Sequence, residues 1–267
     1  MPTIPISKSE FGNKRFKRYD SYAFAGKDAV APLVLRELVR ASAALPIAFV
    51  RIRETVLPVA ILGLGSQKNL FVASDGRWIG RYVPSVYRGY PFSLAKDSQD
   101  RQILCFDEGS GLLSDTEGES FFSEDGKPTV GINNVLNFLT EVAANRQLTE
   151  RIGALLLQHG LLEPWSITVE TQLDEPAQSL DGLMRVKEDA LGQLTPKDLH
   201  TLHQNGALPA IYYQLSSMQH LAGLENLAKE VRLAEKEAAL PKNEAGDLDL
   251  SFLADDTTIS FEDFDDL

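Results

Sequence analysis

Short stretches of strand-forming residues crowd together between residues 45 and 130, and this arrangement constrains the fold more than any other feature of the chain. Such stretches occur at residues 48–53, 59–62, 69–73, 78–83 and 102–106. Asp75-Gly76 separates two of them and predicts a hairpin with a type I′ turn, which needs positive φ at both central residues. Strands that follow one another without intervening helices favour an antiparallel or mixed sheet. We therefore expect an α+β fold with a sheet built from hairpins and packed by helices.

Helical periodicity dominates the second half of the chain. The expected helices are 133–158, 196–206 and 209–240, the first with a break near Asn145 and the last interrupted near Gly223. Gly160 suits the end of the first helix, and Thr195-Pro196 suits the start of the second, because threonine caps free N–H groups and proline has none to satisfy. Further strands are expected at 166–172 and 183–186, and an earlier helix at 29–44, capped by Asp28.

These patterns divide the chain into three expected parts. They are a basic and aromatic arm at residues 1–27, a body at 28–240 and an acidic tail at 241–267. The body is expected to be rich in sheet over 45–130 and rich in helix over 131–240. The aromatic rings of the arm either pack onto the body or form a docking strand for a partner.

The net charge of −12 comes mainly from the tail. Nine of the 38 acidic residues lie between Glu244 and Leu267, a stretch without Lys or Arg, so the rest of the chain is close to neutral. Neither part offers the broad basic surface that a phosphate backbone requires, and we expect no nucleic-acid binding. The tail mixes its acids with apolar residues, as disordered docking segments do, and Phe252, Phe261 and Phe264 are its candidate docking residues. The alternative is a solubilising tail without a target.

Hydropathy and cysteine content point to the cytoplasm. No apolar run reaches the roughly 18–20 residues that span a bilayer, and the longest, Val56–Leu64, contains Pro58. No apolar stretch of a secretory signal follows the basic N-terminus. The single cysteine, Cys105, excludes an internal disulfide. The alternative location is the cell surface, reached by non-classical or type I export through the acidic tail.

The sequence contains no recognisable catalytic or cofactor-binding constellation. Gly63 and Gly65 follow an apolar run, but the third glycine and the helix of a dinucleotide site are missing. His200 and His203 share a helix face without a third metal ligand of defined spacing. Acidic neighbours raise the pKa of a thiol, which disfavours Cys105 as a nucleophile and favours a buried, structural cysteine. We therefore predict no catalytic residue, no metal and no cofactor.

Residues 75–94 interleave aromatic rings with arginines and are the best candidate for a binding face. Pro84 and Pro91 exclude a long helix and impose an extended, kinked path. Aromatic and arginine side chains anchor many binding surfaces because they bury a large area with few rotors to freeze. The candidate binding residues are Trp78, Tyr82, Arg88, Tyr90 and Phe92. The alternative is that these rings fill the core of the sheet.

The same segment carries a family resemblance. The pattern Asp75-Gly-Arg-Trp-x-Gly-x-Tyr-Val-Pro…Arg88-x-Tyr-Pro-Phe resembles the bacterial SapC-like family, and further blocks match in the same order. Those blocks begin at Leu104, Phe121, Gly160, Gly182 and Gly206. The resemblance covers roughly residues 10–230 and carries over no catalytic residues to this chain. It implies an accessory role, because family members are often encoded near flavin-dependent halogenase-like proteins and receptor systems.

Our leading hypothesis is a non-catalytic binding or accessory protein of the bacterial cytoplasm. Residues 77–92 would engage a partner, another protein in the first place, or a small ligand, and the tail would dock elsewhere. One alternative is an enzyme with an unfamiliar site around Arg88, Cys105 and Asp107, or around the pair His200 and His203. The other is a surface-layer-associated structural protein.

Overall fold

The computed structural model describes residues 3–65, 67–169 and 178–239. The chain divides into two compact units, Met1–Glu225 and Asn226–Leu267. The described part of the second unit is the end of helix α8 (Leu221–Ala239), and the sheets and pockets lie in the first. The tail with its candidate docking residues lies outside the described residues, and the domain boundaries at residues 27 and 240 stay predictions.

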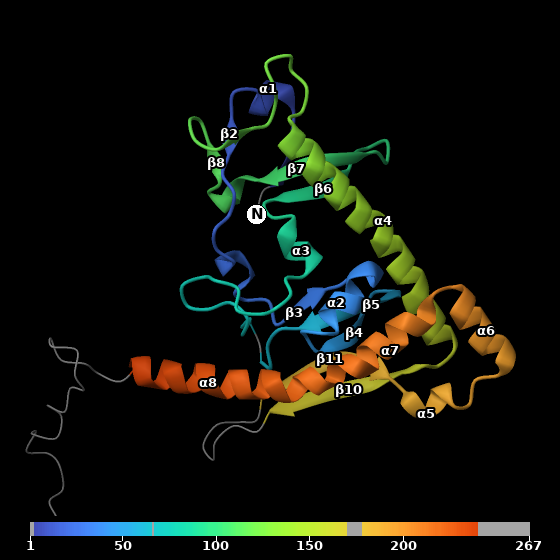
Figure 1. The fold of residues 1–267 in the computed structure, drawn as a ribbon. Helices are drawn as coiled ribbons and strands as arrows, with labels where there is room; N and C mark the ends of the chain where they lie inside the picture. Colours follow the sequence, from blue (N-terminus) through green and yellow to red (C-terminus); the bar gives the residue numbers. More distant parts are fainter. Residues whose placement is uncertain (1–2, 66, 170–177, 240–267) are drawn as a thin grey trace, which may run out of the picture. The chain divides into compact units, whose positions relative to one another are not determined.

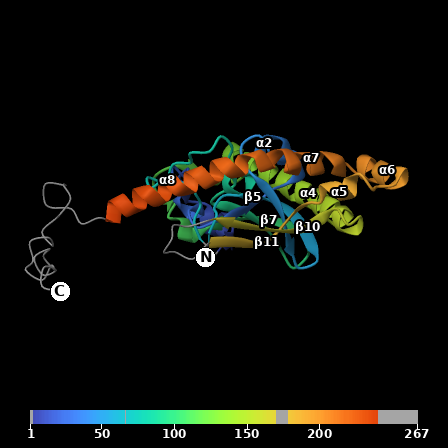
Figure 2. The ribbon, with the colours of Figure 1, turned by 90° about the horizontal axis from the view of Figure 1, so that it is seen from below.

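The larger sheet of the first unit has five antiparallel strands in the order β10-β11-β4-β5-β3. They are β3 (Val30–Pro32), β4 (Ile47–Ile52), β5 (Thr55–Ile61), β10 (Leu162–Val169) and β11 (Gln178–Val186). Helices α4 (Val130–Gln158) and α7 (Ala207–Ser217) both contact this sheet and lie on one side of it (Figure 2). The predicted α+β fold with antiparallel sheets is confirmed.

Two smaller antiparallel sheets lie near the start of α4 (Figure 1). One consists of β1 (Thr3–Pro5), β7 (Gln102–Asp107) and β6 (Phe92–Lys96), and the other of β8 (Leu113–Ser114), β2 (Arg15–Phe16) and β9 (Glu119–Ser120). Five buried rings, here called the phenylalanine core, pack together beside them: Phe11, Phe16, Phe92, Phe106 and Phe121. The N-terminal residues therefore supply two strands and two core rings.

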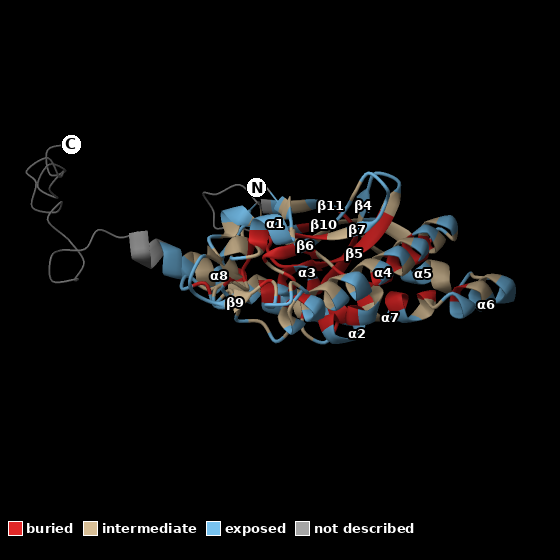
Figure 3. Ribbon diagram, turned by 90° about the horizontal axis from the view of Figure 1, so that it is seen from above, coloured by how far each residue is buried: buried red, intermediate tan, exposed pale blue. Residues whose placement is uncertain are grey.

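Helix α4 contributes to both hydrophobic cores. Ile132 near its start packs with the phenylalanine core, whereas Ile152 and Leu156 near its end pack in the core of the five-stranded sheet. Gly153 lets α4 lie close to β5, because a methyl group there would collide with the carbonyl oxygen of Val56. The helix runs without interruption, so the break expected near Asn145 does not occur. Figure 3 shows that buried residues lie along β5 and within α7, which belong to the core of the five-stranded sheet.

The C-terminal part of the first unit is helical, as predicted. Its helices are α5 (Glu188–Leu191), α6 (Pro196–Gln204), α7 and the start of α8. Thr195 caps α6 by accepting a hydrogen bond from the Asp198 N–H (3.2 Å), and Gly206 follows it with φ of 72°. The interruption of the last helical region lies at Met218–His220 and not at Gly223.

The helix expected over residues 29–44 is wrong. The chain forms strand β3, a 3-10 turn η2 (Leu35–Glu37) and the short helix α2 (Leu38–Ala41). Pro32 explains the difference, because proline removes a backbone donor from a helix interior but is tolerated on an edge strand. In β3 it pairs with Val59 at the edge of the sheet.

The hairpin predicted around Asp75-Gly76 is correct in position and wrong in type. The strands expected at 69–73 and 78–83 reduce to one bridge, Val72 to Trp78. The N–H of Gly76 donates to the carbonyl of Ala73 (2.8 Å), and of the two predicted turn residues only Gly76 has positive φ, at 83°. This is a turn followed by a bulge glycine, so Asp75 keeps an ordinary backbone conformation.

Candidate functional site

The predicted binding residues lie in three places: two pockets, and a cluster of aromatic rings, here called the ring cluster, formed by Trp78 with Tyr22, Phe71 and Tyr87. Trp78 is half-buried and belongs to the ring cluster: its ring stacks on Phe71 at 5.7 Å between centroids and lies 5.6 Å from Tyr22 and 5.8 Å from Tyr87. Its indole Nε1 is buried and has no hydrogen-bond partner among the residues that the structure describes. Trp78 therefore packs among neighbouring rings and lines neither pocket.

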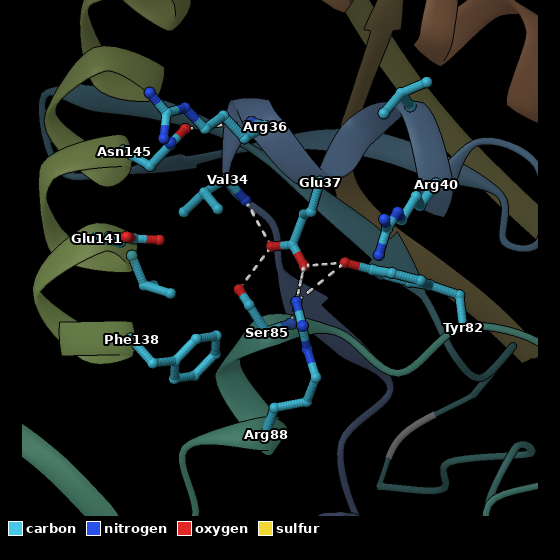
Figure 4. Close-up of a pocket in the computed structure, with 12 residues that line it drawn as sticks. Val34, Arg36, Glu37, Arg40, Tyr82, Ser85, Arg88, Phe138, Glu141 and Asn145 are labelled. Atoms are coloured by element: carbon cyan, nitrogen blue, oxygen red, sulfur yellow. Dashed lines mark hydrogen bonds and ion pairs between the residues drawn. The ribbon is translucent and has the colours of Figure 1, made fainter. Parts of the chain in front are cut away.

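Helix α3 (Ser85–Arg88) carries the segment across the middle of α4, between the two cores (Figure 1). One pocket opens there, with a volume of about 450 Å³. We call it the arginine pocket (Figure 4), and its lining residues are Val34, Arg36, Glu37, Val39, Arg40, Tyr82, Ser85, Arg88, Phe138, Glu141, Val142 and Asn145. Of the predicted binding residues, it contains Tyr82 and Arg88.

Glu37 is the structural centre of the arginine pocket. Its side chain is only 5% exposed, yet four hydrogen bonds reach its two carboxylate oxygens. Oε1 accepts hydrogen bonds from the Val34 N–H (2.8 Å) and the Ser85 hydroxyl (2.7 Å). Oε2 accepts from the Ser85 N–H (2.8 Å) and the Tyr82 hydroxyl (2.7 Å). A buried carboxylate is stable when donors replace its water in this way.

Helix α4 fixes the backbone that follows Val34 through two side chains. The side-chain oxygen of Asn145 accepts from the Arg36 N–H (3.1 Å), and the Thr149 hydroxyl accepts from the Leu35 N–H (2.9 Å). Together with Glu37, these side chains satisfy the N–H groups that begin a helical turn and have no partner within it. The residues after Val34 are thereby fixed so that Arg36 and Arg40 line the pocket.

Arg88 is held loosely. Its guanidinium donates one hydrogen bond, at 3.3 Å, to the Tyr82 hydroxyl and lies 3.8 Å from Glu37 Oε2. It also lies over the rings of Phe138 (5.3 Å to the centroid) and Tyr82 (5.8 Å), and its side chain is 41% exposed. A guanidinium has five N–H donors, so most of its hydrogen-bonding capacity is unused by these contacts.

Burial and the hydrogen bond to Glu37 raise the pKa of Tyr82. The hydroxyl therefore stays protonated at neutral pH and acts as a donor to the carboxylate. The positive charges of Arg88 and Arg40 lower the pKa of Tyr82 by smaller amounts and offset part of this rise.

A second pocket, of about 460 Å³, shares Arg88 with the first. We call it the tyrosine pocket, and its lining residues are Phe16, Lys17, Arg18, Tyr19, Tyr22, Arg88, Gly89, Tyr90, Pro91, Phe92, Glu119, Gly131, Asn134 and Val135. Tyr90 stacks on Phe24 with centroids 3.8 Å apart, whereas Phe92 belongs to the phenylalanine core. Burial raises the pKa of Tyr19 to about 12, against a smaller opposing effect of Arg88.

The groups of the enzyme alternative do not meet. Cys105 is buried on β7 and burial raises the pKa of its thiol, while Asp107 caps the next turn by accepting from the Gly109 N–H (3.0 Å). His200 and His203 are exposed on α6. None of these four residues lines either pocket of Arg88, and the described residues contain no group of three metal-ligating side chains.

Sequence reasoning found Tyr82 and Arg88 but missed the residues that face them. Glu37, Arg36 and Arg40 lie in the range of the expected helix 29–44, which does not form. Phe138 and Asn145 lie on α4, where periodicity predicts a helix without indicating that these two side chains face a pocket. The available signal was Glu37 itself, a lone acid among Val34, Leu35, Leu38 and Val39. A charge in an apolar stretch is buried only with partners.

The fold and the site define an α+β protein with an open pocket lined by three arginines and by a buried carboxylate that accepts four hydrogen bonds. The chain belongs to the SapC family, whose model matches residues 6–224 of its 267 residues; this confirms the resemblance. No curated protein and no solved structure matches the chain. Within the described ranges, no helix is both long and apolar enough to cross a membrane.

Proposed function

We propose that the chain is a non-catalytic binding protein with an accessory role, and that residues 77–92 are its recognition segment. The observation that supports this most strongly is the position of Arg88. It lines both pockets, is partly exposed and is held by a single long hydrogen bond. A cation kept in this state can change partners at low cost when a ligand arrives.

The state of the neighbouring groups favours binding over catalysis. A general acid or base works best with a pKa near the operating pH, whereas burial raises the pKa values of Tyr82 and Tyr19 above their ordinary value of 10. Glu37 accepts four hydrogen bonds and has no free lone pair directed at the pocket. These groups shape the pocket and fix its charge.

The partner and the location belong to the same proposal. We expect another protein as the physiological partner, and an association with halogenase-like or receptor-system proteins stays a prediction from family context. The cytoplasmic location rests on the sequence alone. Docking through Phe252, Phe261 and Phe264 concerns residues outside the described ranges.

Capture with matched variants tests the proposal. The full-length protein, Arg88→Gln and the control Arg51→Gln are immobilised and exposed to a lysate of the source cell, and the retained proteins and small molecules are quantified. Arg51 is exposed on β4 and lines neither pocket. We expect at least one species to be retained by the wild type and by Arg51→Gln but lost from Arg88→Gln. Identical retention by all three proteins contradicts the proposed role of the segment.

A further inference from the structure

We propose that the arginine pocket binds a small organic anion, a carboxylate carried on a flat apolar group. This inference rests on the proposed function and deepens it, because it assigns a ligand class to one of the two pockets. Charge, apolar surface and size each support it.

The lining of the pocket carries a net positive charge, and two of its arginines have no ion-pair partner among the described residues. Three arginines line the pocket, Arg36, Arg40 and Arg88, against two acids, Glu37 and Glu141, so the lining carries a net charge of +1. Figure 4 shows the guanidinium groups of Arg40 and Arg88 on the side of Glu37 and Tyr82, and that of Arg36 beside Asn145. Within the described part of the chain, neither Arg36 nor Arg40 forms an ion pair. Four hydrogen bonds already occupy the two oxygens of the Glu37 carboxylate, so Glu37 offers Arg36 and Arg40 no free acceptor.

Arg88 supplies a further donor without damage to the fold. Glu37 keeps its four hydrogen bonds when Arg88 turns away, since Arg88 lies 3.8 Å from the carboxylate and donates only to Tyr82. An incoming carboxylate can therefore recruit Arg88 together with Arg40. Arginine suits this task, because its planar fork matches the two oxygens of a carboxylate.

The remaining wall is apolar and partly uncovered. Val34, Val142 and Phe138 line the pocket, and Val39, which is 51% exposed, is a further lining residue. The guanidinium of Arg88 lies over the Phe138 ring at 5.3 Å. A flat apolar group placed against Phe138 and Val142, which lie one turn apart on α4, would cover this surface, and the gain from covering apolar surface is about 25 cal/mol per Å².

The volume of about 450 Å³ fits a small molecule. A cationic ligand next to Glu37 and Tyr82 would meet the guanidinium groups of Arg40 and Arg88, and a bare inorganic anion would leave the apolar wall uncovered. A neutral apolar ligand would leave the arginine donors without a new acceptor. An amphipathic anion satisfies the charged and the apolar walls together.

Calorimetric titration with a matched probe series tests the assignment on the full chain. The probes are 1-naphthoate, 1-naphthalenemethanol, 1-naphthylmethylamine and sodium sulfate, at constant ionic strength. We expect 1-naphthoate to bind about tenfold or more tightly than the alcohol, the amine or sulfate, which corresponds to one charge-assisted hydrogen bond. Equal binding of the alcohol or of sulfate overturns the assignment.

Substitutions of pocket residues test whether 1-naphthoate binds in the arginine pocket. Arg40→Gln and Arg88→Gln should each weaken 1-naphthoate about tenfold or more, and Phe138→Ala should weaken it as well, while Arg51→Gln leaves it unchanged. Arg36 and Arg40 are exposed, so Arg40→Gln is expected to fold normally. An unchanged affinity in Arg40→Gln and Arg88→Gln overturns the assignment. If 1-naphthoate does not bind but lysate capture still depends on Arg88, only the ligand class fails and the proposed function stands.

Discussion

Replacing Glu37 with glutamine should destabilise the protein severely although it changes one atom. Each carboxylate oxygen accepts one backbone N–H and one hydroxyl: Val34 and Ser85 at Oε1, and Ser85 and Tyr82 at Oε2. Hydroxyl groups can rotate and accept from the new amide. A backbone N–H cannot, so in either orientation of the amide one buried N–H faces an NH2 group.

The magnitude follows from that geometry. One hydrogen bond to a charged acceptor is worth about 1.5–3 kcal/mol, and leaving a buried donor unsatisfied costs about 1–3 kcal/mol. We therefore expect Glu37→Gln to lower the free energy of unfolding by roughly 3–5 kcal/mol. No contribution of Arg88 is counted, because its side chain is partly exposed and its ion pair is long.

Urea unfolding followed by circular dichroism measures this free energy. Glu141→Gln is the matched control, since Glu141 lines the same pocket but is exposed, and it should change stability by less than about 0.5 kcal/mol. A loss below about 1 kcal/mol for Glu37→Gln, with an unchanged dependence on urea, would show that the carboxylate is not the centre of this network.

Three further predictions concern other parts of the fold. Gly153→Ala should lower the free energy of unfolding by roughly 1–3 kcal/mol, because the methyl group meets the Val56 carbonyl; Gly223→Ala in α8, where nothing lies within 4 Å, should raise it by up to about 1 kcal/mol. Tyr19 keeps its proton to a pKa of about 12 in the folded state, so its contribution to stability is complete below pH 10 and disappears as the pH rises toward 12. Tyr19→Phe should flatten that decline in urea unfolding, and an unchanged slope would refute the assignment. Cys105 should react with a thiol reagent at pH 8 far more slowly in the native than in the urea-unfolded chain, because burial raises the pKa of its thiol; equal rates would contradict its burial.

The elements that the sequence predicted well are those determined by local chemistry. The helix at 133–158 and the ends at Thr195 and Gly160 follow from periodicity and capping, and the structure contains them at Val130–Gln158, at the start of α6 and at a glycine with φ of 62°. The strands predicted at 48–53 and 102–106 appear as β4 and β7. Their backbone preferences and their tertiary environment agree.

The features that the sequence did not predict depend on residues far away in the chain. Residues 30–32 form a strand because β5 offers them an edge, and no local pattern reports that edge. The pocket depends on contacts between segments far apart in the chain, such as Ser85 with Glu37 and Arg36 with Asn145. The sequence therefore predicts the aromatic and arginine segment that supplies Tyr82 and Arg88. It does not predict that residues 34–40 and helix α4 form the other walls of the pocket.

The most direct test of the binding account observes the arginine side chains themselves. In a protein with ¹⁵N-labelled arginine, the Nε–H signals of Arg36, Arg40, Arg88 and Arg51 are followed by NMR during titration with 1-naphthoate. We predict that the signals of Arg36, Arg40 and Arg88 shift together along one saturable curve while that of Arg51 stays in place. Unchanged signals at all three pocket arginines, or equal shifts at Arg51, would contradict it.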